Sequence, residues 1–237
     1  SCHIYVIFIH KKAGKSNEGL FCRYVEKMMK ETDSQLKKVF PVAFATNEAY
    51  APYMSVAIQS LIDHAAADND YRVYVLYSQL SEETKQTLNK MSTGNVRVEL
   101  KDMSEFVDDI PLYVHSHFSV ETYYRFWLPE LFKEYDKILY LDCDMLVRAD
   151  VAELFNYDLG DNYIGACRDL LPKSLSSYIT DELSCLPENY FNAGLTMFNV
   201  SAWLENGLYE KCMEKLNQFR NLQYLDQDIL NMIFIGM

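Results

Sequence analysis

Short runs of apolar residues recur along the chain from residue 41 onward, and amphipathic or polar segments separate them. Runs rich in Val, Ile, Tyr and Phe predict buried strands, whereas apolar residues at helical spacing predict helices packed on a core. The predicted strands span residues 42–46, 72–77, 96–100, 137–141, 163–167 and 195–199. The predicted helices span residues 51–66, 81–91, 120–128, 202–219 and 226–234. This alternation predicts an α/β fold with a mostly parallel sheet flanked by helices, which binds ligands at the carboxyl ends of its strands.

The first forty residues differ from the rest in charge. They carry a net charge of +4, whereas the remainder carries −16, so we place a boundary near Pro41. Within them, an apolar run at residues 4–9 predicts a strand, and apolar residues at roughly helical spacing predict a helix over residues 18–39. We interpret residues 1–40 as a basic appendage and residues 41–237 as one domain. A membrane-surface role for the basic helix is the alternative.

The net charge of −12 over 237 residues excludes nucleic acid as a main partner, because phosphate binding needs a basic face. A polyanionic ligand can still bind if a metal ion brings the positive charge. No apolar run reaches the roughly 18 residues that span a bilayer. The six cysteines show no C-x-x-C pairing, which predicts reduced thiols. We therefore expect a cytoplasmic protein, associated at most peripherally with the inner face of the membrane.

The predicted strand 137–141 runs directly into Asp142-Cys143-Asp144. Residues i and i+2 of an extended chain project to the same side, so both carboxylates can face one cation. Oxygen ligands suit Mn²⁺ or Mg²⁺, which commonly bridge carboxylates to a substrate phosphate. An acidic pair at a strand end can equally be solvated or can cap a turn. Two adjacent carboxylates repel each other unless they share a cation or a proton. Because this pair directly follows an apolar strand, we favour a metal site over a solvated pair.

A phosphatase of the haloacid-dehalogenase type is another class of protein with a D-x-D pair. In that class Gly-Thr usually follows the second Asp, whereas Met145 and Leu146 follow it here. That class also places its motif on the first strand of the core, whereas this pair follows the fourth predicted strand. We therefore disfavour this alternative.

Six stretches of the chain together resemble glycosyltransferase family 8, the retaining family that includes bacterial lipopolysaccharide α-galactosyl- and glucosyltransferases. They occur in the order and spacing of that family, at residues 44–50, 122–125, 140–147, 165–169, 190–194 and 226–231. The resemblance implies a Rossmann-like GT-A fold, a UDP-glucose or UDP-galactose donor, Mn²⁺ or Mg²⁺ as cofactor, and a saccharide or lipopolysaccharide-type acceptor. Residues 1–40 lie outside it.

The resemblance also implies roles for individual residues. The nucleotide pocket would be formed by Ala45, Thr46, Asn47 and Tyr50. The donor sugar and diphosphate would be contacted by Arg125, Asp142, Cys143, Asp144, Asn192 and Gly194, with the metal on Asp142 and Asp144. Asn192 and Gly194 are expected in a turn before a strand. The reacting centre would be formed by Asp169, Asp226 and Gln227, with His117 near the acceptor. An amide such as Gln227 is a poor nucleophile, so a covalent intermediate and front-side attack both remain open.

Two features depart from the family pattern. Ala49 stands where the family commonly has Asn or another polar residue. Relatives continue to a His-x-x-Gly-x-x-Lys-Pro segment, whose His completes the metal site and whose Lys contacts the diphosphate, and no such segment precedes Met237. With this C-terminal part of the family domain missing, we expect an incomplete metal site. A truncated nucleotide-sugar-binding module without efficient turnover is therefore the alternative to an active enzyme.

Overall fold

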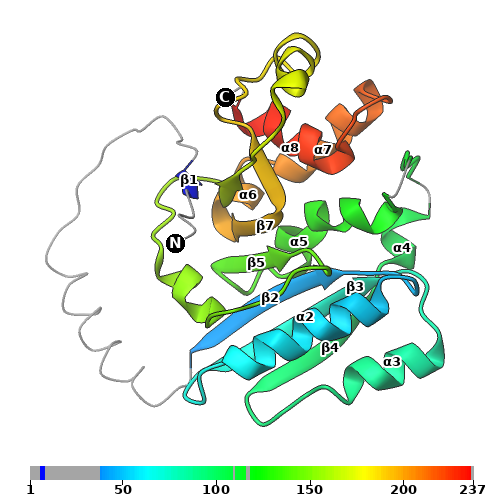
Figure 1. The fold of residues 1–237 in the computed structure, drawn as a ribbon, viewed down its shortest axis with the longest axis vertical. Helices are drawn as coiled ribbons and strands as arrows, with labels where there is room; N and C mark the ends of the chain where they lie inside the picture. The colour runs from blue at the N-terminus through cyan, green and yellow to red at the C-terminus, as the bar shows by residue number, and fades with distance from the viewer. Residues whose placement is uncertain (1–5, 9–37, 109, 116–117, 236–237) are drawn as a thin grey trace, which may run out of the picture.

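Seven strands form one mixed sheet in the computed structural model, which describes residues 6–8, 38–108, 110–115 and 118–235. Their order across the sheet is β1-β6-β7-β5-β2-β3-β4 (Figure 1). The strands are β1 (Val6–Phe8), β2 (Val39–Ala45), β3 (Asp70–Tyr77), β4 (Val96–Asp102), β5 (Lys137–Leu141), β6 (Ile164–Arg168) and β7 (Phe191–Asn199). Each strand predicted from the sequence is therefore present, with ends that differ by a few residues.

Most of the strands point in one direction. β2 pairs in parallel with β3 and with β5, and β3 pairs in parallel with β4. β7 runs antiparallel to β5 and to β6, and β1 runs antiparallel to β6. Five of the seven strands, β2 to β6, thus share a direction, which confirms the prediction of a mostly parallel sheet.

Side-chain alternation along β2 explains why both faces of the sheet are covered. Val42 and Phe44 pack into a core with the helix α2 (Ala51–His64), which lies in front of β2, β3 and β4 in Figure 1. Ala43 and Ala45 belong to the core on the other face. That second core is covered by η2 (Val120–Trp127), α5 (Leu128–Leu131), α6 (Val200–Glu205), α7 (Leu208–Gln218) and α8 (Leu225–Ile235).

The helices agree with the sequence predictions except where backbone geometry intervenes. α3 (Glu82–Asn89) begins as predicted, because Ser81 Oγ accepts a hydrogen bond from the backbone N–H of Thr84 at 3.2 Å. The predicted helix 202–219 is two helices, α6 and α7, because Gly207 adopts a left-handed φ of 57° that ends the first of them. The predicted helix 120–128 is a 3₁₀ helix, η2, which α5 continues.

Four short elements were not predicted. They are α4 (Ser104–Val107), η3 (Val151–Asn156), η4 (Lys173–Leu175) and η5 (Tyr178–Glu182). Each is too short to show a periodic apolar pattern, so sequence reasoning assigns such segments to loops.

Part of the predicted N-terminal appendage lies among the described residues. β1 falls within the strand predicted at residues 4–9 and pairs with β6. Residues 9–37 lie outside the described residues, and with them most of the helix predicted over residues 18–39. β2 begins at Val39, so the predicted helix cannot extend to residue 39, and the strand starts ahead of the change in charge near Pro41.

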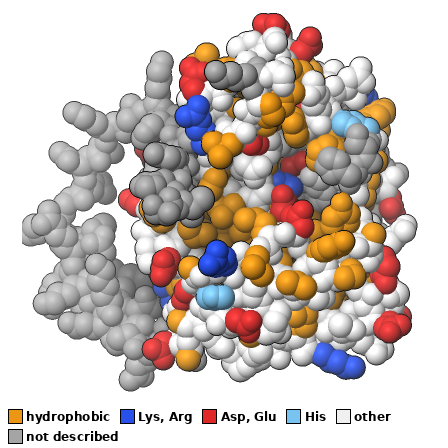
Figure 2. All heavy atoms as spheres, in the orientation of Figure 1, with side chains coloured by type: hydrophobic (Ala, Val, Ile, Leu, Met, Phe, Trp, Pro, Cys, Tyr) orange, Lys and Arg blue, Asp and Glu red, His pale blue; other side chains and the backbone are white. Residues whose placement is uncertain are grey.

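The surface shows no gathering of basic side chains on the face drawn in Figure 2, where Lys and Arg are scattered among acidic and apolar groups. Among the described residues, no helix has both the length and the apolar composition that crossing a bilayer requires. Four of the cysteines, Cys143, Cys167, Cys185 and Cys212, are free thiols. Cys2 and Cys22 lie outside the described residues.

Candidate functional site

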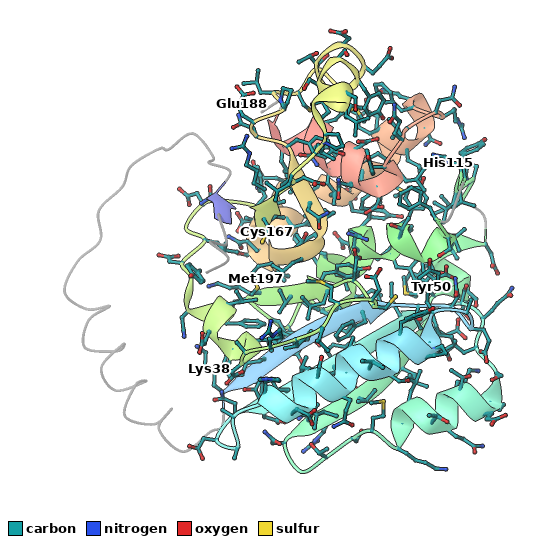
Figure 3. The ribbon with its side chains drawn as sticks, viewed as in Figure 1. Lys38, Tyr50, His115, Cys167, Glu188 and Met197 are labelled. Atoms are coloured by element: carbon teal, nitrogen blue, oxygen red, sulfur yellow. The ribbon has the colours of Figure 1, made fainter. Side chains whose placement is uncertain are left out.

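A cavity of about 210 Å³ opens where β2 and β5 reach their carboxyl ends. In Figure 3, Tyr50 lies beyond the end of β2, whereas Lys38 marks the opposite, amino-terminal edge of that strand. The cavity therefore lies at the edge of the sheet where ligands bind in open α/β folds. Its lining residues are Ala45, Thr46, Asn47, Tyr50, Phe118, Ser119, Glu121, Thr122, Arg125, Tyr140, Asp142, Cys143 and Asp144.

Eight predicted ligand-binding residues line this cavity. Ala45, Thr46, Asn47 and Tyr50 come from the end of β2 and the turn into α2, and the D-x-D segment follows β5. Arg125 comes from η2. The other five predicted residues do not line the cavity. Gly194 contacts Asp142, Asp226 contacts Arg125, and Asp169 accepts hydrogen bonds from Asn192 and Gln227. His117 lies outside the described residues.

The two carboxylates of the D-x-D segment differ in exposure. The Asp142 side chain is half-buried, and its Oδ1 accepts a hydrogen bond from Arg125 Nη2 at 3.1 Å. Asp144 is exposed at the mouth of the cavity. One oxygen of Asp142 is thus held by the protein, while its Oδ2 and the Asp144 carboxylate are available as oxygen ligands on the same cavity.

Cys143 lies between the two carboxylates in the lining of the cavity. Burial raises the pKa of its thiol to about 12, and the neighbouring Asp142 and Asp144 charges act in the same direction. The thiol is therefore protonated at neutral pH. Because the thiolate is the nucleophilic form, this thiol is a poor nucleophile, and Cys143 lines the cavity between the two carboxylates.

Arg125 connects the carboxylate of Asp142 to the start of α8. Its side chain is almost fully buried, and its Nε lies 2.8 Å from Oδ2 of Asp226. Its Nη1 donates to the carbonyl of Ala193 at 2.6 Å, and its guanidinium carbon lies 4.2 Å above the ring of Tyr140. Most donors of this guanidinium are thus used by protein groups. A buried arginine with two carboxylates and an aromatic face around it fixes the relative positions of η2, β5 and α8.

Asp226 is the second member of this ion pair. Burial raises the pKa of its carboxyl to about 6, against the opposing effects of Arg125 and of a hydrogen bond from Thr122. Thr122 Oγ1 donates to its Oδ1 at 2.5 Å. The carboxylate is therefore held by two residues of η2, and its charge depends on pH in a range close to neutral.

Gln227 has its amide fixed in one orientation. Its Oε1 accepts a hydrogen bond from the backbone N–H of Ala193 at 2.9 Å. Its Nε2 donates to Oδ2 of Asp169 at 2.9 Å and to the hydroxyl of Tyr190 at 3.3 Å. The carbonyl oxygen, which would have to act as the nucleophile, thus already accepts one hydrogen bond, and this bond fixes its direction.

Asp228 is the centre of a hydrogen-bond cluster that sequence reasoning did not identify. Its Oδ1 accepts from the hydroxyl of Tyr190 at 2.5 Å, and its Oδ2 accepts from the hydroxyl of Tyr178 at 2.6 Å. The backbone N–H of Tyr224 donates to the same Oδ2 at 2.8 Å. Burial raises the pKa of Asp228, and these hydrogen bonds oppose that shift. This hydrogen-bond cluster joins η5 and Tyr190, the residue before β7, to α8 beside Gln227.

The sequence predicted that Asn192 and Gly194 lie in a turn before a strand, and this prediction is wrong. They lie inside β7, where the register with β6 shifts between Ala166, which pairs with Thr196, and Cys167, which pairs with Asn192. Such an irregularity bends a strand and redirects its groups. Here the carbonyl of Gly194 accepts a hydrogen bond from the backbone N–H of Asp142 at 2.8 Å.

Several lining residues were not predicted as site residues. Glu121 and Thr122 are on the first turn of η2, and Tyr140 is the penultimate residue of β5. Thr122 stands within the family-like stretch at residues 122–125, whereas Glu121 precedes it and has no signal in the sequence. Its position becomes evident only when η2 is packed against the end of β2.

Residues 41–237 match the family model of glycosyl transferase family 8. The chain belongs to this family. Its sheet and flanking helices have the GT-A fold, as in a solved structure of the galactosyltransferase LgtC with donor and acceptor sugar analogs. That structure is 34% identical to the chain, has a TM-score of 0.71, and is matched over 83% of this chain and 71% of that one.

Curated relatives carry names of the same kind. A putative glycosyltransferase of Haemophilus influenzae is 29% identical over 202 residues, which are 82% of this chain and 59% of the relative. A lipopolysaccharide 1,2-glucosyltransferase of Escherichia coli is 26% identical over 209 residues, 84% of this chain and 60% of the relative. The chain thus spans about three-fifths of the length of these two relatives.

Proposed function

We propose that this chain transfers a hexose, glucose or galactose, from a UDP-sugar to a saccharide acceptor, with retention of configuration and with a divalent metal ion. One observation supports the proposal above the others. The cavity at the sheet edge brings Asn47 and Tyr50 together with the carboxylates of Asp142 and Asp144. A nucleotide sugar can use both parts, because its aromatic base can stack on the ring of Tyr50 and its anionic diphosphate can bind a metal ion that the two carboxylates hold. The name of the Escherichia coli relative favours an acceptor of the lipopolysaccharide type.

The oxygen donors at the cavity fit Mn²⁺ or Mg²⁺. These ions prefer oxygen ligands and are usually held by one or two carboxylates, with the substrate phosphates and water completing the shell. Asp144 and Oδ2 of Asp142 would hold the ion. When bound, it supplies positive charge that stabilises the departing diphosphate.

The remaining residues orient the donor. Arg125 holds Asp142 in place and is also ion-paired to Asp226. In this proposal Asp226 contacts the hydroxyls of the donor sugar. Gln227 and Asp169 hold each other. Because Oε1 of Gln227 is bonded to Ala193, this arrangement favours a route in which Gln227 positions the anomeric carbon over a route in which it attacks that carbon.

A thermal-shift panel followed by a transfer assay tests the proposal. UDP-glucose and UDP-galactose with Mn²⁺ should raise the melting temperature, because a ligand that binds the folded state stabilises it by mass action. With an oligosaccharide of the lipopolysaccharide type as acceptor, NMR of the product should show an α-linked hexose. Failure of both UDP-sugars to stabilise the protein, with Mn²⁺ present, contradicts the proposal.

A second function, nucleotide-sugar binding without efficient turnover, is favoured by one observation. Among the described residues, no group of three or more His, Cys, Asp or Glu side chains is arranged to hold a metal ion. Two carboxylates should bind Mn²⁺ weakly without nucleotide and more tightly with its diphosphate. Stabilisation by UDP-sugars combined with undetectable transfer and undetectable donor hydrolysis would establish this second function.

A further inference from the structure

Glu121 places a buried carboxylate in the wall of the cavity. The residue is 7% exposed, and it lines the cavity beside the turn that follows β2. Its Oε2 accepts a hydrogen bond from Nδ2 of Asn47 at 3.1 Å. Within the described part of the chain, its other carboxylate oxygen has no hydrogen-bond partner.

The partner of Glu121 can face it in only one orientation. Oδ1 of Asn47 accepts hydrogen bonds from the backbone N–H groups of Ala49 at 3.1 Å and of Tyr50 at 3.2 Å. The amide nitrogen of Asn47 must therefore point towards Glu121. The turn after β2 thus fixes Asn47, and Asn47 fixes Glu121.

One oxygen of this carboxylate can therefore accept a hydrogen bond from a bound ligand. Its place in the first turn of η2 is favourable, because the amino end of a helix attracts negative charge. The oxygen that Asn47 leaves free, Oε1, is not among the fully buried side-chain atoms without a partner, so it is accessible, and a ligand or water in the cavity can donate a hydrogen bond to it. The neighbouring charges offer no compensation, since Asp142 and Asp144 are also acidic and Arg125 is paired to Asp226.

We infer that Glu121 is a specificity-determining residue that accepts a hydrogen bond from a neutral N–H or O–H donor of the nucleoside. This inference rests on the proposed function. A phosphate cannot take this position, because like charges in a cavity repel each other. The imide N–H of a uracil base and the hydroxyls of its ribose are neutral donors of the required kind. Glu121 therefore selects nucleosides that present such a donor next to Asn47.

Glu121→Gln tests the inference with little change in shape. The amide oxygen of the variant can keep the bond from Asn47, and its NH₂ group then faces the cavity, so a donor replaces the acceptor. Glu48→Gln is the matched control. Glu48 is the residue after Asn47 and also carries one negative charge, but it is exposed and bonded to Ser81 and Thr84 outside the cavity.

The measurement is calorimetric affinity, with Mn²⁺, for UDP and for three analogues: N3-methyl-UDP, 2′-deoxy-UDP and 3′-deoxy-UDP. We expect Glu121→Gln to lower the affinity for UDP by about tenfold or more, because hydrogen bonds to charged groups are among the strong ones. The loss should disappear for the analogue that lacks the bonded donor. That analogue identifies the base or a ribose hydroxyl as the partner. Glu48→Gln should leave all four affinities unchanged.

Two results overturn the inference while leaving the proposed function intact. One is an unchanged affinity of Glu121→Gln for UDP, which would mean that the carboxylate accepts no hydrogen bond from the nucleoside. An increased affinity counts in the same way and would mean that the carboxylate only repels the diphosphate. The other is an equal loss for UDP and all three analogues, which would mean that Glu121 only supports the fold. A wild-type protein that binds no UDP in the presence of Mn²⁺ overturns the inference and the proposed function together.

Discussion

Gly194 lies directly beneath the carboxylate of Asp142. Its carbonyl accepts a hydrogen bond from the backbone N–H of Asp142 at 2.8 Å. A Cβ atom added at Gly194 would overlap Oδ2 of Asp142 and would lie 3.0 Å from Oδ1 of Asn192. The missing side chain at residue 194 is therefore what allows the candidate metal ligand its present position.

Gly194→Ala should displace that ligand. The added methyl forces the Asp142 side chain to rotate, and the fold tolerates this because the displaced group is the end of a half-buried side chain. We expect the Mn²⁺-dependent affinity for UDP to fall by about tenfold or more, with a change in unfolding free energy within about 1 kcal/mol. Gly94→Ala is the control, since a Cβ there meets nothing within 4 Å. Equal affinities of the two variants for UDP would mean that Asp142 does not bind the ion.

Asp142→Asn and Asp144→Asn should each abolish Mn²⁺-dependent binding of UDP. Asp144 is exposed, so its loss should change stability by less than about 0.5 kcal/mol. Asp142→Asn also loses the ion pair with Arg125, which should cost no more than about 1 kcal/mol because the Asp142 side chain is 40% exposed. Circular dichroism checks the fold and calorimetry the affinity, with the exposed Asp161→Asn as control. Wild-type affinity in either variant would show that the acidic pair is structural.

Asp226 should make stability depend on pH. Burial raises the pKa of Asp226 from 3.8 to about 6 in the folded state. The folded protein then holds this proton more tightly than the unfolded chain, so the contribution of Asp226 is complete below pH 4 and is lost as pH rises through 6. The unfolding free energy of the wild type relative to that of Asp226→Asn should fall by up to about 3 kcal/mol between pH 4 and pH 7. Urea denaturation at four pH values measures it, and parallel profiles of the two proteins would contradict the expectation.

Tyr190→Phe should be more destabilising than Tyr178→Phe. Removal of the Tyr190 hydroxyl leaves Oδ1 of buried Asp228 without its donor, at a cost of about 1–3 kcal/mol. Removal of the Tyr178 hydroxyl leaves Oδ2 with the backbone N–H of Tyr224, so we expect a smaller loss. Urea denaturation compares both with Tyr157→Phe, whose side chain is 51% exposed. The reverse order of the two losses would show that Oδ1 finds another donor.

The pattern of apolar residues was sufficient to predict the order of strands and helices, because β2 to β5 alternate or run apolar in the ordinary way. It did not predict the break at Gly207, where an amphipathic pattern continues across a residue of left-handed φ. Nor did it predict that β7 begins at Phe191 and shifts register beside β6, because a change of pairing partner leaves no periodic signal.

The sequence likewise predicted some residues of the candidate site and not others. Residues contiguous with a strand end, such as Asn47 and Asp142, were placed on the cavity by strand order and family resemblance. The pairing of Arg125 with Asp226 joins residues 101 positions apart, and the sequence contains nothing that reports it. Glu121 was missed because a single carboxylate at a helix start is typical of exposed helix ends, and its burial arises only from the contact between η2 and β2.

Calorimetric titration of UDP into the 237-residue chain, with and without Mn²⁺, tests metal-dependent nucleotide binding most directly. Asp142, Asp144 and Glu121 make the cavity acidic, and its lining arginine is already paired. The diphosphate should therefore bind measurably only when Mn²⁺ supplies the positive charge. We expect a binding isotherm with Mn²⁺ and none, or one at least tenfold weaker, in the presence of a chelator. Equal affinity for UDP under the two conditions, or no binding in either, would contradict this function.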